Sequence, residues 1–239
     1  MSNLSRARRL YENAAYNLRW LASLRMGPAR RRAYLDRVRR DTFERIFAEA
    51  RWGAQHLSGG GSTPDYTAVT RRIVVDAVRH HGIGSMLDLP CGDFAWMPGA
   101  LEQLPPGFTY IGADISPGLI ARNRARFPQR RFEVLDVVTD RLPPVELIFC
   151  RDALQHLPIP DIQRALENIS ASGAQYLLTT TYLRYYGLRN RRNIRPGRTR
   201  DRNLLLPPFN LADPLLLYSE QDPGHKFLGL WKLPLQYVD

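Results

Sequence analysis

Short apolar runs alternate with amphipathic stretches through the middle of the chain. The runs are rich in β-forming residues, whereas the stretches between them repeat their apolar positions at helical spacing. Strands that alternate with helices predict a parallel, doubly wound α/β sheet. The first predicted strand ends at Asp88, and the predicted strands after it cover residues 108–113, 131–135, 146–150 and 176–181.

Both ends of the chain differ from this alternation. Residues 2–25 and 29–52 read as two arginine-rich helices, and we expect them to form an N-terminal extension to a domain over 53–239. They also suit packing on another subunit or on a membrane surface. Near the C-terminus, residues 215–218 and 227–233 predict a last hairpin that closes the sheet in antiparallel fashion.

The turn after the first predicted strand carries acids and a glycine, which suits a ligand that lies at the end of the strand. Asp88 and Asp93 flank Gly92, where the backbone can approach a ligand with no Cβ in the way. The G-x-G-x-x-G pattern of pyrophosphate loops is absent. These residues favour a cofactor that has a positive group and no phosphates.

Acids recur at the ends of the following strands. Asp114 follows the second strand, where it suits ribose hydroxyls, and Ile115 after it suits the adenine face. Asp136-Val137 follows the third strand, where a carboxylate accepts from an amino group, and Asp152 follows the fourth. Four consecutive strand ends with acids predict a site for an adenosyl cofactor.

Composition narrows the setting but leaves the partner open. The net charge is +11, and almost all basic residues are arginines. An arginine-rich surface suits phosphate backbones, but a general arginine bias accounts for it equally well. The sequence has no apolar run long enough to span a membrane and no secretory signal. With Cys91 and Cys150 alone, we expect reduced thiols and a cytoplasmic protein.

Several blocks of residues resemble a subgroup of the class I, Rossmann-like S-adenosylmethionine-dependent methyltransferases. They are Trp52-Gly53, the 58–62 loop, 88–97, 110–115, the Arg-Asp-x-Leu-x-His-Leu block 151–157, and the late Asn203-Leu204 and Pro208-Phe209. The resemblance implies a mostly parallel seven-stranded sheet, S-adenosylmethionine as cofactor, and methyl transfer to an acceptor. The candidate cofactor-binding residues are Ser62, Asp88, Pro90, Gly92, Asp93, Asp114, Ile115, Asp136, Val137 and Arg151.

The loop over 58–62 ends at a predicted helix. Thr63 suits an N-cap and Pro64 a first helical position, with the helix running to about His81. Ser62 and the free N–H groups there suit a carboxylate, such as that of the cofactor. The glycines of the loop equally suit a plain linker.

Asp152 and His156 are the catalytic candidates. If the chain after the fourth strand is α-helical, the two lie one turn apart on one face, so Asp152 can orient His156 as a general base. Asp152 also suits the cofactor or a metal ion, and His156 also suits a packing role. The sequence does not separate these roles.

The acceptor is the least defined part of the prediction. The long connection 182–208 is rich in tyrosine, asparagine and arginine, which suits a hydroxyl-rich acceptor. We expect O-methylation of a sugar, a glycan or another polar small molecule. A nucleic-acid methyltransferase and a cofactor-binding protein without catalysis are the alternatives.

Overall fold

The computed structural model describes residues 18, 21–53, 57–183, 190, 192–220 and 225–238. The chain divides into two compact units, Met1–Asp41 and Thr42–Asp239. Helix α2 (Pro28–Ala48) replaces the helix expected over 29–52 and runs through this division, which precedes the expected boundary at residue 52. Most of the helix expected over 2–25 lies outside the described residues. None of the described helices has the length and apolar character to cross a membrane.

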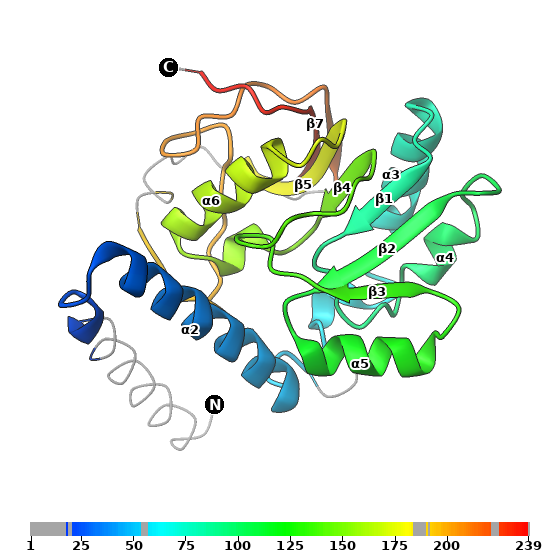
Figure 1. The fold of residues 1–239 in the computed structure, drawn as a ribbon. Coiled ribbons are helices and arrows are strands. Elements are labelled where there is room, and N and C mark those ends of the chain that lie inside the picture. Colours follow the sequence, from blue (N-terminus) through cyan, green and yellow to red (C-terminus); the bar gives the residue numbers. More distant parts are fainter. Residues whose placement is uncertain are drawn as a thin grey trace. The chain divides into compact units, whose positions relative to one another are not determined.

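The second unit is built on a seven-stranded sheet in the order β3-β2-β1-β4-β5-β7-β6 (Figure 1). The first five strands are parallel, and β7 runs antiparallel to both of its neighbours. This order confirms the predicted doubly wound sheet with its closing hairpin. The strands are β1 (Ser85–Asp88), β2 (Thr109–Asp114), β3 (Arg131–Val134), β4 (Leu147–Cys150), β5 (Tyr176–Tyr182), β6 (Leu216–Ser219) and β7 (Lys226–Lys232).

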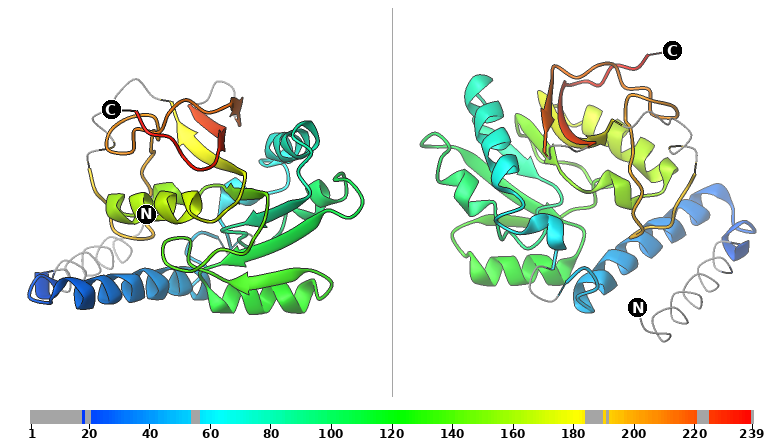
Figure 2. Two further views of the ribbon diagram at one scale, coloured as in Figure 1. Left: turned by 45° about the horizontal axis from the view of Figure 1, so that its top comes forward. Right: turned by 180° about the vertical axis from the view of Figure 1, so that it is seen from behind.

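Side chains alternate between the two faces of the sheet, and each face has its own hydrophobic core. Leu87 and Ile148 pack in one cluster with Ile162 and Leu166 of α6 (Ile159–Ser170). Their neighbour Met86 packs in the other cluster, with α3 (Ala68–His80), α4 (Pro98–Leu101) and α5 (Pro117–Arg126). Figure 2 shows α6 and α3 on opposite faces. Helices cover both faces of the sheet, and the carboxyl ends of β1 to β5 form one common edge because these strands are parallel.

Helix α3 begins later than the sequence predicts. Thr63 Oγ1 does accept the N–H of Tyr66 at 3.3 Å, as an N-cap would, but the residues that follow form a turn that precedes the helix. The short 3-10 helix η1 (Gly60–Ser62) precedes that turn, and α3 begins at Ala68. Ser62 therefore lies in η1, away from the start of a long helix.

The segment after β4 also differs from the prediction. It forms the short 3-10 helix η2 (Leu154–His156), and Asp152 lies outside it with a left-handed φ of 52°. Its N–H donates to Thr180 Oγ1 at 3.0 Å, which ties the turn to β5. The α-helical turn expected between Asp152 and His156 is therefore wrong.

Candidate active site

The predicted cofactor acids gather along the carboxyl edge of the sheet. Asp88 ends β1 and Asp114 ends β2, the neighbouring parallel strand. Asp136 follows β3 by two residues and Asp152 follows β4 by two. The structure thus brings to one edge the four acids that lie far apart in the sequence.

Asp88 is buried under the loop that follows β1. The hydroxyl of Tyr110 donates to its Oδ2 at 2.7 Å. Burial raises the pKa of Asp88 to about 8, although the Tyr110 hydrogen bond opposes that rise. With a pKa this high, Asp88 is largely protonated at pH 7, so it adds little negative charge to the middle of the carboxyl edge of the sheet.

Asp114 is buried as well but faces several donors. Burial raises its pKa to about 6, against the N–H groups of Ser116, Gly92 and Ile115, which lower it. The Ser116 N–H lies 3.0 Å from Oδ1. The pKa of Asp114 therefore lies about one unit below neutral pH. The carboxyl group stands at the strand end where ribose hydroxyls are expected.

The residues expected around the adenine are divided. Ile115 is half-buried, whereas Val137 lies within the core cluster that α6 covers. Asp136 is buried and its Oδ1 accepts the N–H of Val138 at 3.0 Å. Asp136 thus stabilises its own turn through one of its two carboxylate oxygens.

Two hydrogen bonds, together called the latch, join the loop after β1 to the chain before η1. Ser58 Oγ accepts the N–H of Asp93 at 2.8 Å, and Asp93 Oδ2 accepts the N–H of Leu57 at 3.1 Å. A Cβ at Gly92 would overlap Ser58 Oγ and lie 3.0 Å from Ser58 Cβ. Asp93 and Gly92 therefore hold this loop, and Pro90 is half-buried beside them.

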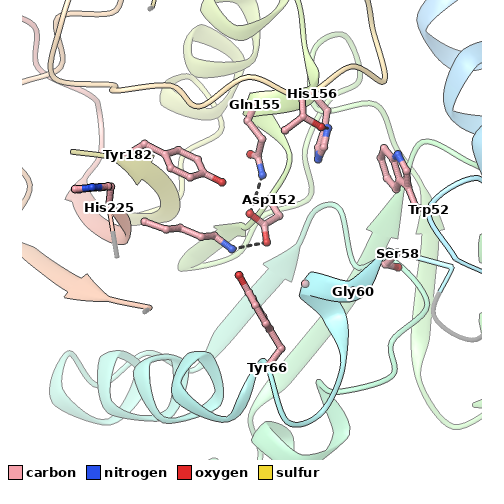
Figure 3. Close-up of a pocket in the computed structure, with 13 residues that line it drawn as sticks. Trp52, Ser58, Gly60, Tyr66, Asp152, Gln155, His156, Tyr182 and His225 are labelled. Atoms are coloured by element: carbon pink, nitrogen blue, oxygen red, sulfur yellow. Dashed lines mark hydrogen bonds and ion pairs between the residues drawn. The ribbon is translucent and has the colours of Figure 1, made fainter. Parts of the chain in front are cut away.

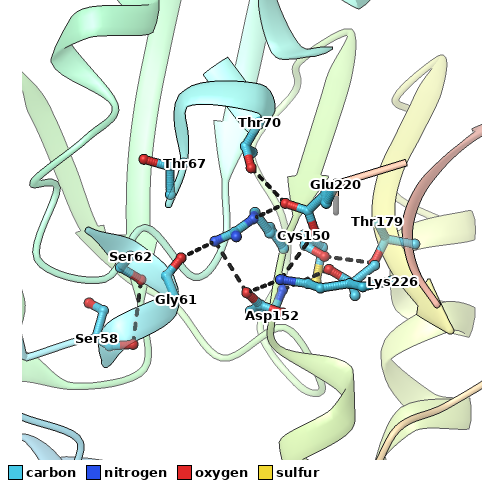
Figure 4. Close-up of polar contacts among 12 residues, drawn as sticks. Ser58, Gly61, Ser62, Thr67, Thr70, Cys150, Asp152, Thr179, Glu220 and Lys226 are labelled. Atoms are coloured by element: carbon cyan, nitrogen blue, oxygen red, sulfur yellow. Dashed lines mark hydrogen bonds and ion pairs between the residues drawn. The ribbon is translucent and has the colours of Figure 1, made fainter. Parts of the chain in front are cut away.

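Four charged side chains form a network beyond the end of β4 (Figure 4). Arg151 Nε donates to Glu220 Oε1 at 2.6 Å, and its Nη1 donates to the Gly61 carbonyl at 3.1 Å. Lys226 Nζ lies 2.6 Å from Asp152 Oδ2 and 3.1 Å from Glu220 Oε2. The two cations balance the two carboxylates, so the network has no net charge.

Asp152 and Lys226 are the members of this network that border a cavity, and Asp152 is the more exposed of the two. Its side chain is 24% exposed, against 4% for Arg151 and 8% for Lys226. Burial alone would raise the pKa of Asp152, but the charges of Arg151 and Lys226 hold it below its ordinary value. The carboxylate is ionised at neutral pH, and Gln155 Nε2 donates to its Oδ1 at 2.7 Å.

The cavity has a volume of about 540 Å³ and opens between η1, η2 and β7 (Figure 3). Figure 3 shows Tyr66 and Tyr182 with their hydroxyl ends turned toward Asp152. Such a volume suits a small-molecule acceptor. The cavity is lined by Trp52, Ser58, Gly59, Gly60, Gly61, Tyr66, Asp152, Gln155, His156, Tyr182, Thr199, His225 and Lys226.

His156 borders the cavity with one ring nitrogen already engaged. Its Nδ1 lies 3.2 Å from the Arg198 carbonyl and 3.2 Å from Thr199 Oγ1. A carbonyl only accepts, so Nδ1 carries the proton and Nε2 keeps its lone pair. Burial lowers the pKa of His156, and the negative charge of Asp152 only partly opposes this. The ring is neutral at pH 7, the form that a general base needs.

Asp152 does not orient the His156 ring. Both of its oxygens are engaged by Arg151, Lys226 and Gln155, and Arg198 and Thr199 hold the imidazole instead. The His156 ring also stacks beside Trp52, with centroids 4.8 Å apart. The hydrogen bonds that fix His156 therefore come from the connection after β5.

Sequence reasoning missed Glu220 and Lys226, the two members of the charged network that do not follow β4. Glu220 follows β6 and Lys226 begins β7, both far from Asp152 in the chain. One signal was available, since Lys226 is one of only two lysines in an arginine-rich chain. Among the residues that the structure describes, no group of three or more His, Cys, Asp or Glu side chains gathers as a metal site.

Comparison with known proteins shows what the chain and its fold are similar to. Residues 87–173 match the family described as "Methyltransferase domain". A trans-aconitate 2-methyltransferase from Methylobacterium nodulans is 35% identical over 91 residues, 34% of this chain and 33% of that protein. The chain thus spans only about a third of the curated relative that it matches.

Two solved structures have the same fold. Human N-acetylserotonin methyltransferase, in complex with S-adenosylmethionine, has a TM-score of 0.53 at 19% identity. The match covers 70% of this chain and 52% of that chain. Magnesium protoporphyrin IX methyltransferase from Synechocystis PCC 6803, with bound S-adenosylhomocysteine, has a TM-score of 0.52 at 13% identity. The match covers 70% of this chain and 84% of that chain.

The strand order and the similar solved structures define the class of fold. The sheet is that of the Rossmann-like, class I S-adenosylmethionine-dependent methyltransferases. The acceptor differs among the relatives, so the class alone does not identify it.

Proposed function

We propose that this protein transfers a methyl group from S-adenosylmethionine to a hydroxyl of a sugar, a glycan or another polar small molecule. The observation that carries the proposal is His156 at the cavity, neutral and with its Nδ1 proton committed to Arg198. A hydroxyl is a weak nucleophile and needs a base to take its proton in the transition state. His156 Nε2 supplies that base at neutral pH.

The described residues fit the cofactor. Arg151 Nη2 is buried and has no hydrogen-bond partner in the part of the chain that the structure describes, so it is a donor available to the carboxylate of the methionine moiety. Gly61, whose carbonyl holds the same guanidinium, borders the cavity. Asp114 would accept from the ribose hydroxyls, and Gly92 lets the β1 loop lie close to the adenosyl group.

Alignment carries much of the expected rate. The bound cofactor supplies a methyl group on a positively charged sulfur, which leaves in an in-line displacement. The chain must hold the acceptor oxygen on the line of attack and exclude water. In this proposal the cavity walls hold the acceptor, and His156 takes the proton as the oxygen–carbon bond forms.

The direct test is His156→Ala, compared with His80→Ala as a matched change at an exposed histidine. We expect His156→Ala to lower kcat by about 10²–10⁴-fold, the worth of a positioned base. The affinity for S-adenosylhomocysteine, measured by calorimetry, should stay unchanged because Nε2 meets the acceptor. Full activity on hydroxyl acceptors would refute the role, and lost cofactor binding would make His156 part of the cofactor site.

One observation favours a second candidate, a nucleic-acid methyltransferase. Residues 183–202 contain eight arginines and a single acid, Asp201, and this segment borders the cavity through Thr199. Arginine-rich segments suit phosphate backbones. A methyl-donor assay on a panel of glycans, RNA and small phenols separates the two candidates, and a third outcome, cofactor binding without any turnover, would indicate a binding protein.

A further inference from the structure

Two groups that only accept hydrogen bonds border the same cavity. His156 presents Nε2 with its lone pair, because Nδ1 holds the proton for the Arg198 carbonyl. Asp152 presents an ionised carboxylate, which has no proton to donate. The two are close enough for the charge of Asp152 to act on His156. A ligand that meets both groups must therefore offer two donors side by side.

Asp152 has room for one more donor. Lys226 at 2.6 Å and Arg151 at 3.2 Å occupy Oδ2, whereas among the described residues Oδ1 accepts only from Gln155, at 2.7 Å. Each carboxylate oxygen accepts about two hydrogen bonds, so Oδ1 keeps one free position. The side chain is held from three directions and cannot turn away from the cavity without losing these contacts.

Backbone geometry also indicates that Asp152 is held in place for a ligand. Its φ of 52° is left-handed, a conformation that residues with a Cβ rarely adopt. The surrounding contacts stabilise that conformation, since Thr180 Oγ1 holds the Asp152 N–H and the ion pairs hold the carboxylate. Such strain collects where a side chain must be aimed.

We infer that the acceptor carries two neighbouring hydroxyls, one of which is methylated at His156 while the other donates to Asp152. This inference rests on the hydroxyl methylation proposed above. In the step, the acceptor oxygen bonds to the methyl carbon as the carbon–sulfur bond of S-adenosylmethionine breaks. The proton of that hydroxyl passes to His156 Nε2, and the neighbouring hydroxyl keeps its proton and hydrogen-bonds Asp152 Oδ1.

The rest of the cavity suits an uncharged ring that carries such a diol. The cations Arg151 and Lys226 are balanced by Asp152 and Glu220, so the wall offers no excess charge to an anionic acceptor. Trp52 stands beside His156 and gives an aromatic wall to the acceptor. A sugar unit meets these conditions, because its ring is uncharged and its hydroxyls are adjacent.

The test compares methyl glycosides on the wild-type protein, so it does not depend on a variant that folds. Each probe is a methyl hexoside with an adjacent pair of free hydroxyls, paired with analogues in which one hydroxyl of the ring is replaced by hydrogen. Removing the neighbour of the methylated hydroxyl should lower kcat/KM at least tenfold, because Asp152 is left unpaired. Removing a hydroxyl elsewhere on the ring should have a smaller effect.

A variant assigns the effect to Asp152. Asp152→Asn keeps the size of the side chain but changes its acceptor capacity, and the exposed Asp76→Asn is the matched control. In Asp152→Asn the penalty for the missing neighbour should shrink, mainly through KM, whereas Asp76→Asn should keep the wild-type penalty. Thermal melting checks that both variants are folded.

The outcomes separate this inference from the proposed function. Equal kcat/KM for the diol glycosides and their deoxy analogues would overturn the diol inference and leave hydroxyl methylation intact. Turnover on RNA with none on any hydroxyl glycoside or phenol would overturn both. An undiminished penalty in folded Asp152→Asn would also overturn the inference, since the second hydroxyl would then meet another group.

Discussion

At the scale of single residues, burial and partners separate carboxyl groups of the same type. Asp114 and Asp152 both follow strands at one edge of the sheet, but burial raises the pKa of Asp114 to about 6. Arg151 and Lys226 hold the pKa of Asp152 below its ordinary value, against its burial. One acid is thus close to protonation at neutral pH and the other is firmly ionised.

The pKa of Asp114 leads to a prediction about cofactor binding. In the proposed site the ionised form would accept two ribose hydroxyls, and each bond to a charged group contributes about 1.5–3 kcal/mol. Asp114→Ala should therefore weaken S-adenosylhomocysteine binding more than tenfold. In the wild type, affinity should be constant above about pH 7 and fall as the pH drops through about 6, because Asp114 is then protonated.

Calorimetry between pH 5 and 8 checks this prediction, with Asp114→Asn as the control that cannot titrate. The affinity of Asp114→Asn should be lower than that of the wild type at pH 8 and nearly independent of pH. Unchanged affinity in folded Asp114→Ala would show that the ribose lies elsewhere.

At the scale of elements, the loop after β1 and the segment before η1 act as one piece. The Ser58–Asp93 and Leu57–Asp93 hydrogen bonds join them, and Gly92 leaves the space that Ser58 fills. Backbone at the edge of the sheet is thereby fixed between the predicted cofactor acids and the cavity. A Cβ at Gly92 should disturb both the loop after β1 and the segment before η1.

Gly92→Ala should lower the free energy of unfolding for two reasons that a control separates. Gly92 has a φ of 55° and its new Cβ would meet Ser58. Gly82 has a φ of 61° and no heavy atom within 4 Å of the new Cβ, so Gly82→Ala measures the backbone cost alone. That cost is about 1–2 kcal/mol.

Urea unfolding of the variants checks the latch. Gly92→Ala should lose more stability than Gly82→Ala, and the excess should fall in the double variant Ser58→Ala/Gly92→Ala, relative to Ser58→Ala. Equal losses for Gly92→Ala and Gly82→Ala would mean that the Ser58 contact costs nothing to displace.

At the scale of the whole molecule, the charge of +11 and the neutral cavity network point to different acceptors. If the acceptor is an uncharged glycan, kcat/KM should change little as the salt concentration rises. A nucleic-acid acceptor would give a steep fall, because each neutralised phosphate adds about −0.7 to −0.9 to the log–log slope through counterion release.

Turnover measured between 50 and 300 mM salt tests the choice, with S-adenosylhomocysteine affinity at each salt concentration as the control. A steep slope together with saturable RNA binding would favour the nucleic-acid candidate. A flat slope with glycan turnover would agree with the cavity.

The sequence by itself determined where the strands end and which acids follow them. An apolar run broken by an acid, as at Asp88 and Asp114, is a local pattern, so the alternation of strands and helices and the acids of the sheet edge were predictable. The class of cofactor followed from the same local pattern, together with the resemblance to methyltransferases.

Tertiary structure alone decided which partners hold the catalytic candidates. Asp152 pairs with Lys226, which lies 74 positions later in the sequence. The carbonyl that fixes the proton of His156 belongs to Arg198, 42 positions away. Local spacing suggested that Asp152 orients His156, but a 3-10 turn replaces the expected helix and these distant partners hold the two side chains instead. Hydrogen bonds and ion pairs between distant segments depend on how the sheet brings its loops together. Local patterns along the chain do not predict these contacts.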